Sequence, residues 1–317
     1  MREAGPTKVL AQYSADRMNF LSIGDLSKEE ILRIFEIADN LKEGKSEMAL
    51  KEDAVAALIF EKPSTRTRVS FEVAMAQLGG HSIYIDSRTS QLSRGESISD
   101  TAKVLSGYVD FIIARLYRHD DLLELAANAS VPVINALTDL EHPCQALSDL
   151  YTVLEVKKRF KGLKLAFVGD IAANTANSLM LGGAKLGMEI ALVGPKGYAP
   201  NTLYFSKARE YSKVGVYDSI EEGVSDADVV YTDTFVSMGQ EEEAEKRRKL
   251  FAPYQVNKKL MSYAKKDAIV MHCLPAHRGE EITDEVIDGP QSVVWQQAKN
   301  KLLLEKAVLL YLSEKEG

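Results

Sequence analysis

A short run of hydroxyl and basic residues, Ser64-Thr65-Arg66-Thr67, follows Pro63 at the expected start of a helix. Backbone N–H groups, hydroxyl groups and a guanidinium group at a helix start can together bind a phosphate, and the positive end of the helix dipole adds to that attraction. The same composition also occurs where a helix is simply capped and its arginines are solvated. On these residues alone both interpretations stay open.

A second polar cluster, His142-Pro143-Cys144-Gln145, stands at the start of a long helix expected over 144–160. The imidazole can donate a hydrogen bond to a carbonyl oxygen, and the carboxamide of Gln145 can accept one from an amide NH₂ group. A loop histidine is more often structural or solvated than catalytic, so this cluster is a weak signal by itself. Carboxylates and thiolates do not recur at metal-ligand spacing, and we therefore expect no metal site.

The second half of the chain has polar positions of its own. Asp233 follows the apolar run VVYT and could hold an ammonium group, whereas Met238 in the next loop suits packing equally well. Cys273 could act as a thiolate, but a cysteine in an apolar run is more often an inert packed residue, and His272 carries the same alternative. A cis Leu274–Pro275 peptide is compatible with the sequence and would turn the carbonyl of its first residue toward a ligand.

Apolar segments alternate with helix-length amphipathic stretches along most of the chain. Buried strands are expected at 54–60, 82–85, 110–114 and 132–135, and the pattern restarts at Lys164 with KLAFVGD, MEIALVG, KVGVYD, DADVVYT, DAIVMHC and SVVWQ. Ser27 and Glu30 form a capping box that opens an earlier helix. This alternation predicts an α/β fold of two doubly wound domains, each a mostly parallel sheet flanked by helices, with a cleft between them. The polar clusters come just after the strands, where such folds bind ligands.

The expected boundaries divide the chain into four parts. Residues 1–17 form an N-terminal extension, 18–146 the first domain and 147–296 the second domain. Residues 297–317 form an apolar-faced helix that is expected to return to the first domain. The restart of the strand pattern after one long helix is the basis for the central boundary.

Composition narrows the class of protein. The chain has 317 residues, 45% hydrophobic and 27% charged, which is typical of a globular protein long enough for two cores. Its net charge of −7 and the lack of a long Lys/Arg block argue against nucleic acid as a partner. No apolar run reaches the ~18 residues of a membrane span, so no membrane partner is expected. Two cysteines are too few for a disulfide framework, which favours the reducing cytoplasm.

Taken in order, these segments resemble the aspartate/ornithine carbamoyltransferase family. STRTR at 64–68 and HPCQ at 142–145 are similar to its carbamoyl phosphate site, while Asp233, SMG at 237–239 and HCLP at 272–275 resemble the members that act on ornithine. The similarity extends from about residue 20 to the end, and four ordered motifs are more specific than any one of them. The resemblance implies direct transfer of a carbamoyl group from carbamoyl phosphate to the side-chain amine of L-ornithine, with no cofactor.

The resemblance also implies a set of site residues. Carbamoyl phosphate would be bound by Ser64, Thr65, Arg66, Thr67, Gln91, Arg115, His142, Pro143, Cys144, Gln145, Cys273, Leu274 and Lys301. Ornithine would be bound by Asn174, Asp233, Ser237 and Met238. Catalytic roles would belong to Arg115, His142 and Cys273. Gln91 matches a position that reaches a neighbouring subunit, which implies a homotrimer or a multiple of trimers.

One departure from the family pattern and three rival functions accompany this interpretation. The family usually has Asn-Arg where this chain has Asn300-Lys301, and lysine keeps the charge but loses the planar guanidinium fork. The strand ending in VGD is followed by IAAN rather than a GxGxxG turn, which argues against a nicotinamide-dependent oxidoreductase. The other rivals are a carbamoyltransferase for putrescine or a modified ornithine, and a binding protein of this fold that has lost catalysis. The direction of the reaction in metabolism is left open by the sequence.

Overall fold

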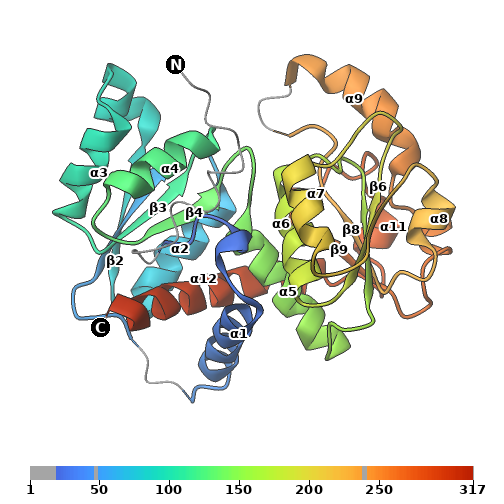
Figure 1. Cartoon of the computed structure of the whole chain (residues 1–317), viewed down its shortest axis with the longest axis horizontal. Helices are drawn as coiled ribbons and strands as arrows, with labels where there is room; N and C mark the ends of the chain where they lie inside the picture. The colour runs from blue at the N-terminus through green and yellow to red at the C-terminus, as the bar shows by residue number, and fades with distance from the viewer. Residues whose placement is uncertain (1–18, 46–48, 238–240, 317) are drawn as a thin grey trace. The chain divides into compact units, whose positions relative to one another are not determined.

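The computed structural model describes residues 19–45, 49–237 and 241–316 (Figure 1). The chain divides into two compact units: the first contains the residues up to Cys144 together with Lys301–Gly317, and the second contains Gln145–Asn300. Helices α5 (Pro143–Lys157) and α12 (Val294–Glu316) each contribute residues to both units. The expected extension over 1–17 lies outside the described residues.

The first unit is built on a four-stranded parallel sheet. Its strands are β1 (Val55–Phe60), β2 (His81–Asp86), β3 (Phe111–Arg115) and β4 (Val133–Leu137), in the order β2-β1-β3-β4. The prediction of these four strands is confirmed to within two residues at each end. β1, β3 and β4 are mainly apolar and almost entirely buried, as expected for parallel strands covered by helices, whereas the edge strand β2 is partly exposed.

Helices cover both faces of this sheet. They are α1 (Lys28–Lys42), α2 (Thr65–Gln77), α3 (Ile98–Ser106) and α4 (His119–Asn128), with short 3₁₀ turns at Ile23–Asp25, Ser87–Thr89 and Gln91–Arg94. α3 and α4 pack on one face around an apolar core, and Figure 1 shows α2 and α12 on the other. The predicted capping box is confirmed, because Ser27 Oγ accepts from the Glu30 N–H at 3.1 Å and the Glu30 carboxylate accepts from the Ser27 N–H at 2.8 Å.

The second unit holds a five-stranded parallel sheet. Its strands are β5 (Lys164–Val168), β6 (Glu189–Val193), β7 (Val214–Tyr217), β8 (Val229–Thr232) and β9 (Ile269–His272), in the order β7-β6-β5-β8-β9. The expectation of a further strand at SVVWQ was wrong, since Ser292 makes one isolated bridge to Val270 and α12 begins at Val294. Val294 and Gln297 are buried while Trp295 is exposed, which is a helical period rather than a strand alternation.

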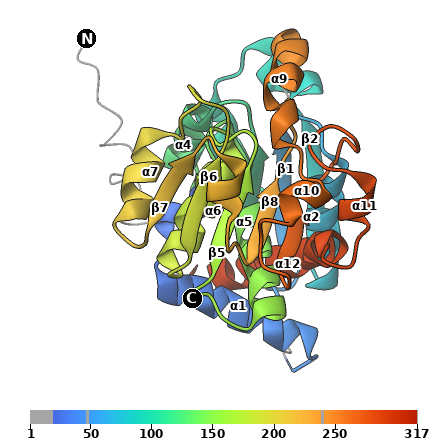
Figure 2. The ribbon, with the colours of Figure 1, turned by 90° about the vertical axis from the view of Figure 1, so that its right-hand side faces the viewer.

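The helices of the second unit also form two layers. They are α6 (Asn174–Lys185), α7 (Thr202–Arg209), α8 (Ile220–Val224), α9 (Ala244–Phe251), α10 (Lys258–Met261) and α11 (Asp284–Ile287), with 3₁₀ turns at Glu241–Glu243 and Ala252–Tyr254. α8, α10 and α11 share one apolar core with the sheet, and α6 and α7 lie side by side over the other face (Figure 2). None of the described helices is long and apolar enough to span a membrane.

The strand order of each sheet marks the position where ligands bind. In the first unit, the connections after β1 and β3 leave toward opposite edges, and in such folds ligands bind at the carboxyl ends of the two strands where this reversal occurs. In the second unit, the same reversal falls between β5 and β8. The residues directly after these four strands are therefore the first candidates for binding and chemistry.

Candidate active site

The start of α2 is organised around a side-chain cap. Ser64 has extended backbone angles as the N-cap residue, and its Oγ accepts from the Thr67 N–H at 3.3 Å. Thr67 is buried, whereas Thr65 and Arg66 are exposed. The first N–H groups of a helix have no partner within the helix, and they carry the positive end of its dipole. This helix start follows β1 at the strand reversal of the first unit, where an anion is well placed to bind.

Arg115 is the last residue of β3 and is only 5% exposed. Its carbonyl oxygen accepts from the Glu61 N–H at 2.9 Å, which joins the end of β3 to the segment that leads into α2. A guanidinium group at the carboxyl end of a parallel strand can donate several hydrogen bonds to an anion or to a polarised oxygen.

His142 is buried in the first unit, near three basic residues. Burial, followed by the positive charges of Lys301, Arg115 and Arg66, holds the pKa of its imidazole well below the ordinary 6.5. The ring is therefore neutral at physiological pH and can donate one N–H without carrying charge.

Cys144 is a buried thiol at the start of α5. Its Sγ donates to the carbonyl oxygen of Asn135 at 3.4 Å, and burial raises the pKa of this thiol far above its ordinary value. A thiol that stays protonated is a weak nucleophile. The side chain of Cys144 is therefore a packing element, and only its backbone is suited to contact a ligand.

In the second unit, Asp233 and Cys273 lie together at the ends of β8 and β9. The Cys273 thiol donates to Asp233 Oδ1 at 3.0 Å, and the same oxygen accepts from the Thr234 N–H at 2.7 Å. Burial and the negative charge of Asp233 raise the pKa of Cys273 well above 9.0. Cys273 is thus a neutral hydrogen-bond donor, and two hydrogen bonds hold the Asp233 carboxylate in one orientation.

The backbone after Cys273 has an unusual conformation. Leu274 has a φ of +60°, and the Leu274–Pro275 peptide is cis, as the sequence allowed. His272 holds this turn, because its Nδ1 accepts from the Leu274 N–H at 2.8 Å while its Nε2 lies 3.1 Å from the buried carboxylate of Glu281. These partners identify the tautomer with the proton on Nε2 and give His272 a structural role.

The other predicted residues have the following positions. Asn174 is the first residue of α6, and its Oδ1 accepts from the Thr175 N–H at 2.7 Å. Gln145 donates to Asp149 Oδ1 at 2.8 Å within α5, and Ser237 is half-buried beyond β8. Met238 lies outside the described residues. Gln91 is exposed in a 3₁₀ turn of the first unit, whereas Lys301 is buried there.

Two family models match the chain in sequence. Residues 18–155 match the aspartate/ornithine carbamoyltransferase carbamoyl-P binding domain, and residues 161–312 match the Asp/Orn binding domain of the same family. The chain belongs to the aspartate/ornithine carbamoyltransferase family. Together the two models account for nearly all of the described residues.

Named relatives and solved structures of this family agree with the match. Ornithine carbamoyltransferase of Pyrococcus abyssi is 52% identical over 303 residues, which are 93% of this chain and 95% of the relative, and that of Bacillus subtilis is 50% identical over 305 residues, 95% of each. The solved ornithine carbamoyltransferase of Pyrococcus furiosus superposes with a TM-score of 0.87 at 52% identity, covering 93% of this chain and 96% of that one.

Two buried carboxylates, which were not predicted from the sequence, lie close to predicted site residues of this family member. Asp149 accepts hydrogen bonds from Gln145, from Gln297 at 2.7 Å and from the Tyr231 hydroxyl at 2.8 Å. Glu305 is fully buried on α12 next to Lys301. The only sequence signal for either was its spacing, since each lies four residues from a predicted site residue on the same helix.

Two groups of side chains have the spacing of metal ligands among the described residues. They are Asp233, His272 and Cys273, and His277, Glu280 and Glu281. In the first group both ring nitrogens of His272 already have partners. In the second, Glu280 is paired with Arg248 at 3.0 Å, and Glu281 accepts from His272. Hydrogen bonds and ion pairs account for both groups.

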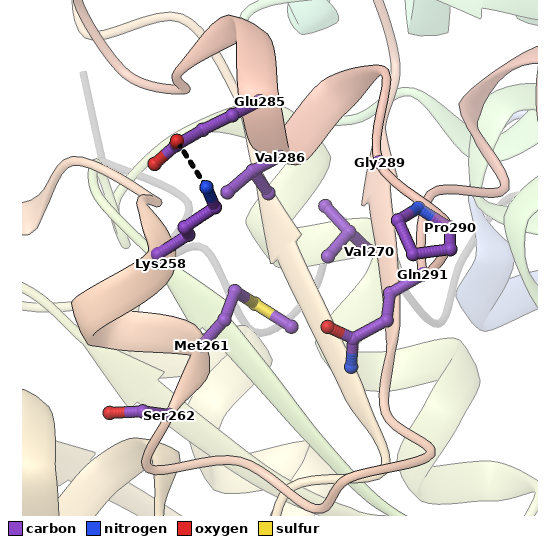
Figure 3. A pocket seen from close by; sticks show the side chains of 9 residues that line it. All are labelled: Lys258, Met261, Ser262, Val270, Glu285, Val286, Gly289, Pro290 and Gln291. Carbon is purple, nitrogen blue, oxygen red and sulfur yellow. Dashed lines mark ion pairs between the residues drawn. The ribbon is translucent and has the colours of Figure 1, made fainter.

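A hollow of about 310 Å³ in the second unit is separate from the predicted residues. Figure 3 shows Met261, Val270 and Val286 pointing into it, with the Lys258 ammonium 2.7 Å from the Glu285 carboxylate at its side. None of the predicted site residues lines it. Its walls combine apolar side chains with the polar residues Lys258, Ser262, Glu285 and Gln291.

Proposed function

We propose that this chain transfers the carbamoyl group of carbamoyl phosphate to the side-chain amine of L-ornithine, giving L-citrulline and phosphate. The proposal is carried by its relatives, which are named ornithine carbamoyltransferase and are 50% to 52% identical over more than nine tenths of the chain. The Pyrococcus furiosus relative is named anabolic, which supports arginine biosynthesis as the direction. The two free cysteines support a reducing cytoplasm as the location.

The first unit supplies the groups for carbamoyl phosphate. The start of α2, with Ser64, Thr65, Arg66 and Thr67, binds the phosphate, and Lys301 adds a further positive charge. Arg115 and the neutral His142 donate to the carbonyl oxygen as it becomes negative in the tetrahedral intermediate. Loss of one such donor lowers the rate about 10²- to 10³-fold in comparable enzymes. The other residues that we propose to bind carbamoyl phosphate are Gln91, Pro143, Cys144, Gln145, Cys273 and Leu274.

The second unit supplies the groups for ornithine. The fixed carboxylate of Asp233 attracts the amino acid's positive charge, and Asn174, Ser237 and Met238 complete the binding set. Cys273 is a neutral donor and does not form a covalent intermediate, because its high pKa keeps the thiol protonated. The uncharged side-chain amine attacks the carbonyl carbon directly, phosphate leaves, and the amine's proton passes to solvent or phosphate.

The test is a colorimetric assay for ureido products with carbamoyl phosphate and, separately, ornithine, aspartate, putrescine or acetylornithine. Citrulline formation with ornithine alone is expected, and Arg66→Ala should reduce it at least about 10²-fold. Arg33→Ala is the matched control, since Arg33 is exposed on α1 and paired with Glu36 at 2.8 Å. Product with another amine would contradict the assignment of the second unit, and no product with any amine would support a binding protein without catalysis.

We further propose a homotrimer or a multiple of trimers. The edge strand β2 and the adjacent α2 expose apolar side chains, with Ile83 52% and Val69 49% accessible, and Gln91 is exposed in a turn that follows β2. Burial of such a face against a second copy would remove apolar area from water. Light scattering on the purified protein should give three chains or a multiple, and Ile83→Lys should lower that number. A wild-type monomer would contradict the proposal.

A further inference from the structure

A buried ion pair connects two residues one turn apart on α12. Lys301 Nζ lies 3.3 Å from Glu305 Oε1, and the two side chains are 7% and 0% exposed. A fully buried carboxylate is rare because its desolvation is costly, and a neighbouring cation usually offsets that cost. The charged form of Glu305 therefore depends on Lys301, and the Lys301 ammonium already has a partner before any ligand binds.

The pair belongs to the anion-binding region of the first unit. Lys301 is buried in the same unit as His142, whose pKa is lowered by burial and then by the positive charges of Lys301, Arg115 and Arg66. Burial raises the pKa of Glu305 while Lys301 and Ser70 of α2 lower it, and burial together with Glu305 raises the pKa of Cys144 at the start of α5. Ser70 is one turn beyond the residues that begin α2. An anion bound at that helix start would therefore compete with Glu305 for the Lys301 ammonium.

We propose that Glu305 is a positioning residue of this anion site: its carboxylate holds the Lys301 ammonium while the site is empty and releases it when a dianionic phosphate group binds. The inference rests on the proposed function only for the identity of the anion as carbamoyl phosphate. Glu305 acts through Lys301 and does not itself touch the substrate.

The protonation of Glu305 should change with anion binding. Burial raises the pKa of Glu305 to about 7, against the lowering influence of Lys301 and Ser70. A dianion nearby favours the protonated, uncharged carboxyl group still further, so binding takes up a proton from solvent near neutral pH. Conversely, deprotonation of Glu305 weakens anion binding, and affinity falls as pH rises through 7. His142 stays neutral and Cys144 stays a thiol in this range.

Calorimetric titration with sulfate tests the inference. A phosphate group changes its own charge near neutral pH, whereas sulfate remains a dianion. For the full-length protein, the sulfate affinity should fall about three- to tenfold from pH 6 to pH 8.5, and binding at pH 7 should take up a fraction of a proton, measured in two buffers of different ionisation enthalpy. In Glu305→Gln the affinity should be independent of pH and equal to or above the wild-type value at pH 6.

Glu314→Gln is the matched control, because Glu314 is exposed on the same helix and pairs with Arg33 at 3.3 Å, so it should keep the wild-type pH dependence. An unchanged pH dependence in Glu305→Gln, or no sulfate binding by the wild type at pH 6, would overturn the inference. If Glu305→Gln does not fold, the proton uptake of the wild type still decides it, and no uptake at pH 7 overturns it. Sulfate binding needs no turnover, so the result is independent of whether citrulline is formed.

Discussion

The Cys273 thiol donates a 3.0 Å hydrogen bond to Oδ1 of Asp233, so the end of β9 is joined to the end of the neighbouring strand β8. The thiol stays protonated because burial and the adjacent carboxylate raise its pKa, and the carboxylate is oriented by the thiol and by the Thr234 N–H. This orientation suits the ornithine-binding role that we propose for Asp233.

Asp233→Asn should raise the KM for ornithine and make Cys273 more reactive. Loss of a charged hydrogen bond costs about 1.5–3 kcal/mol, which corresponds to a roughly 10- to 150-fold higher KM. Removal of the negative charge should lower the pKa of Cys273, so iodoacetamide should alkylate it faster at pH 8, as mass spectrometry can follow. Asp226→Asn, at an exposed carboxylate of the same unit, should change neither value.

His142 should show no titration between pH 6 and 8. Its pKa is lowered in the folded protein, so the neutral form persists throughout this range, and protonation begins only at more acidic pH. Histidine-labelled NMR spectra, assigned by comparison with His142→Asn, should give constant ring shifts for His142 from pH 6 to 8. A midpoint near 6.5 would show that the three cations do not act on this ring.

The rate of carbamoyl transfer should rise toward alkaline pH. An alkyl ammonium group has an ordinary pKa of about 10.4, so the reactive uncharged amine is scarce at neutral pH and its fraction increases as pH rises. Since His142 is already neutral, its titration cannot produce this rise. Initial rates of citrulline formation from pH 6 to 9 at saturating substrates measure the effect. A flat profile would mean that a step other than attack by the amine limits the rate.

Local signals explain which parts of the fold were predictable. The capping box at Ser27 and the N-cap at Ser64 depend on residues within one turn. The buried strands depend on short apolar runs, so all of these elements could be predicted from the local sequence. The prediction of a strand at SVVWQ was wrong because an apolar run of five residues does not distinguish a strand from the first turn of a buried helix. The residue roles assigned by family resemblance remain predictions.

The buried charged residues could not be predicted from the local sequence. Glu305 stands in the run LLLEKAV, and a single charged residue on a helix is usually solvated, so its burial depends on the elements that cover α12. Asp149 likewise acquires its partners Tyr231 and Gln297 from distant parts of the chain. Tertiary contacts of this kind cannot be predicted from the spacing of neighbouring residues in the sequence.

Asp149 should be the carboxylate whose loss most destabilises the second unit. It is fully buried and accepts from Gln145, Gln297 and Tyr231, so Asp149→Leu leaves three buried donors without their acceptor. We expect a loss of at least about 3 kcal/mol in the free energy of unfolding, measured by urea denaturation. Asp267→Asn, at an exposed carboxylate paired with Lys157, should change it by less than about 1 kcal/mol.

The buried ion pair between Arg247 and Asp170 should show strong coupling. Arg247 is 5% exposed on α9, donates to the Asp170 carboxylate after β5, and donates through Nε to the Phe235 carbonyl oxygen at 2.8 Å. Arg247→Met leaves a buried carboxylate uncompensated and should cost about 3–5 kcal/mol of unfolding free energy. The double variant with Asp170→Leu should be more stable than Arg247→Met alone, because no isolated buried charge remains. Arg248→Met, at the exposed neighbour, is the control, and additive losses in the double variant would show that the two charges do not depend on each other.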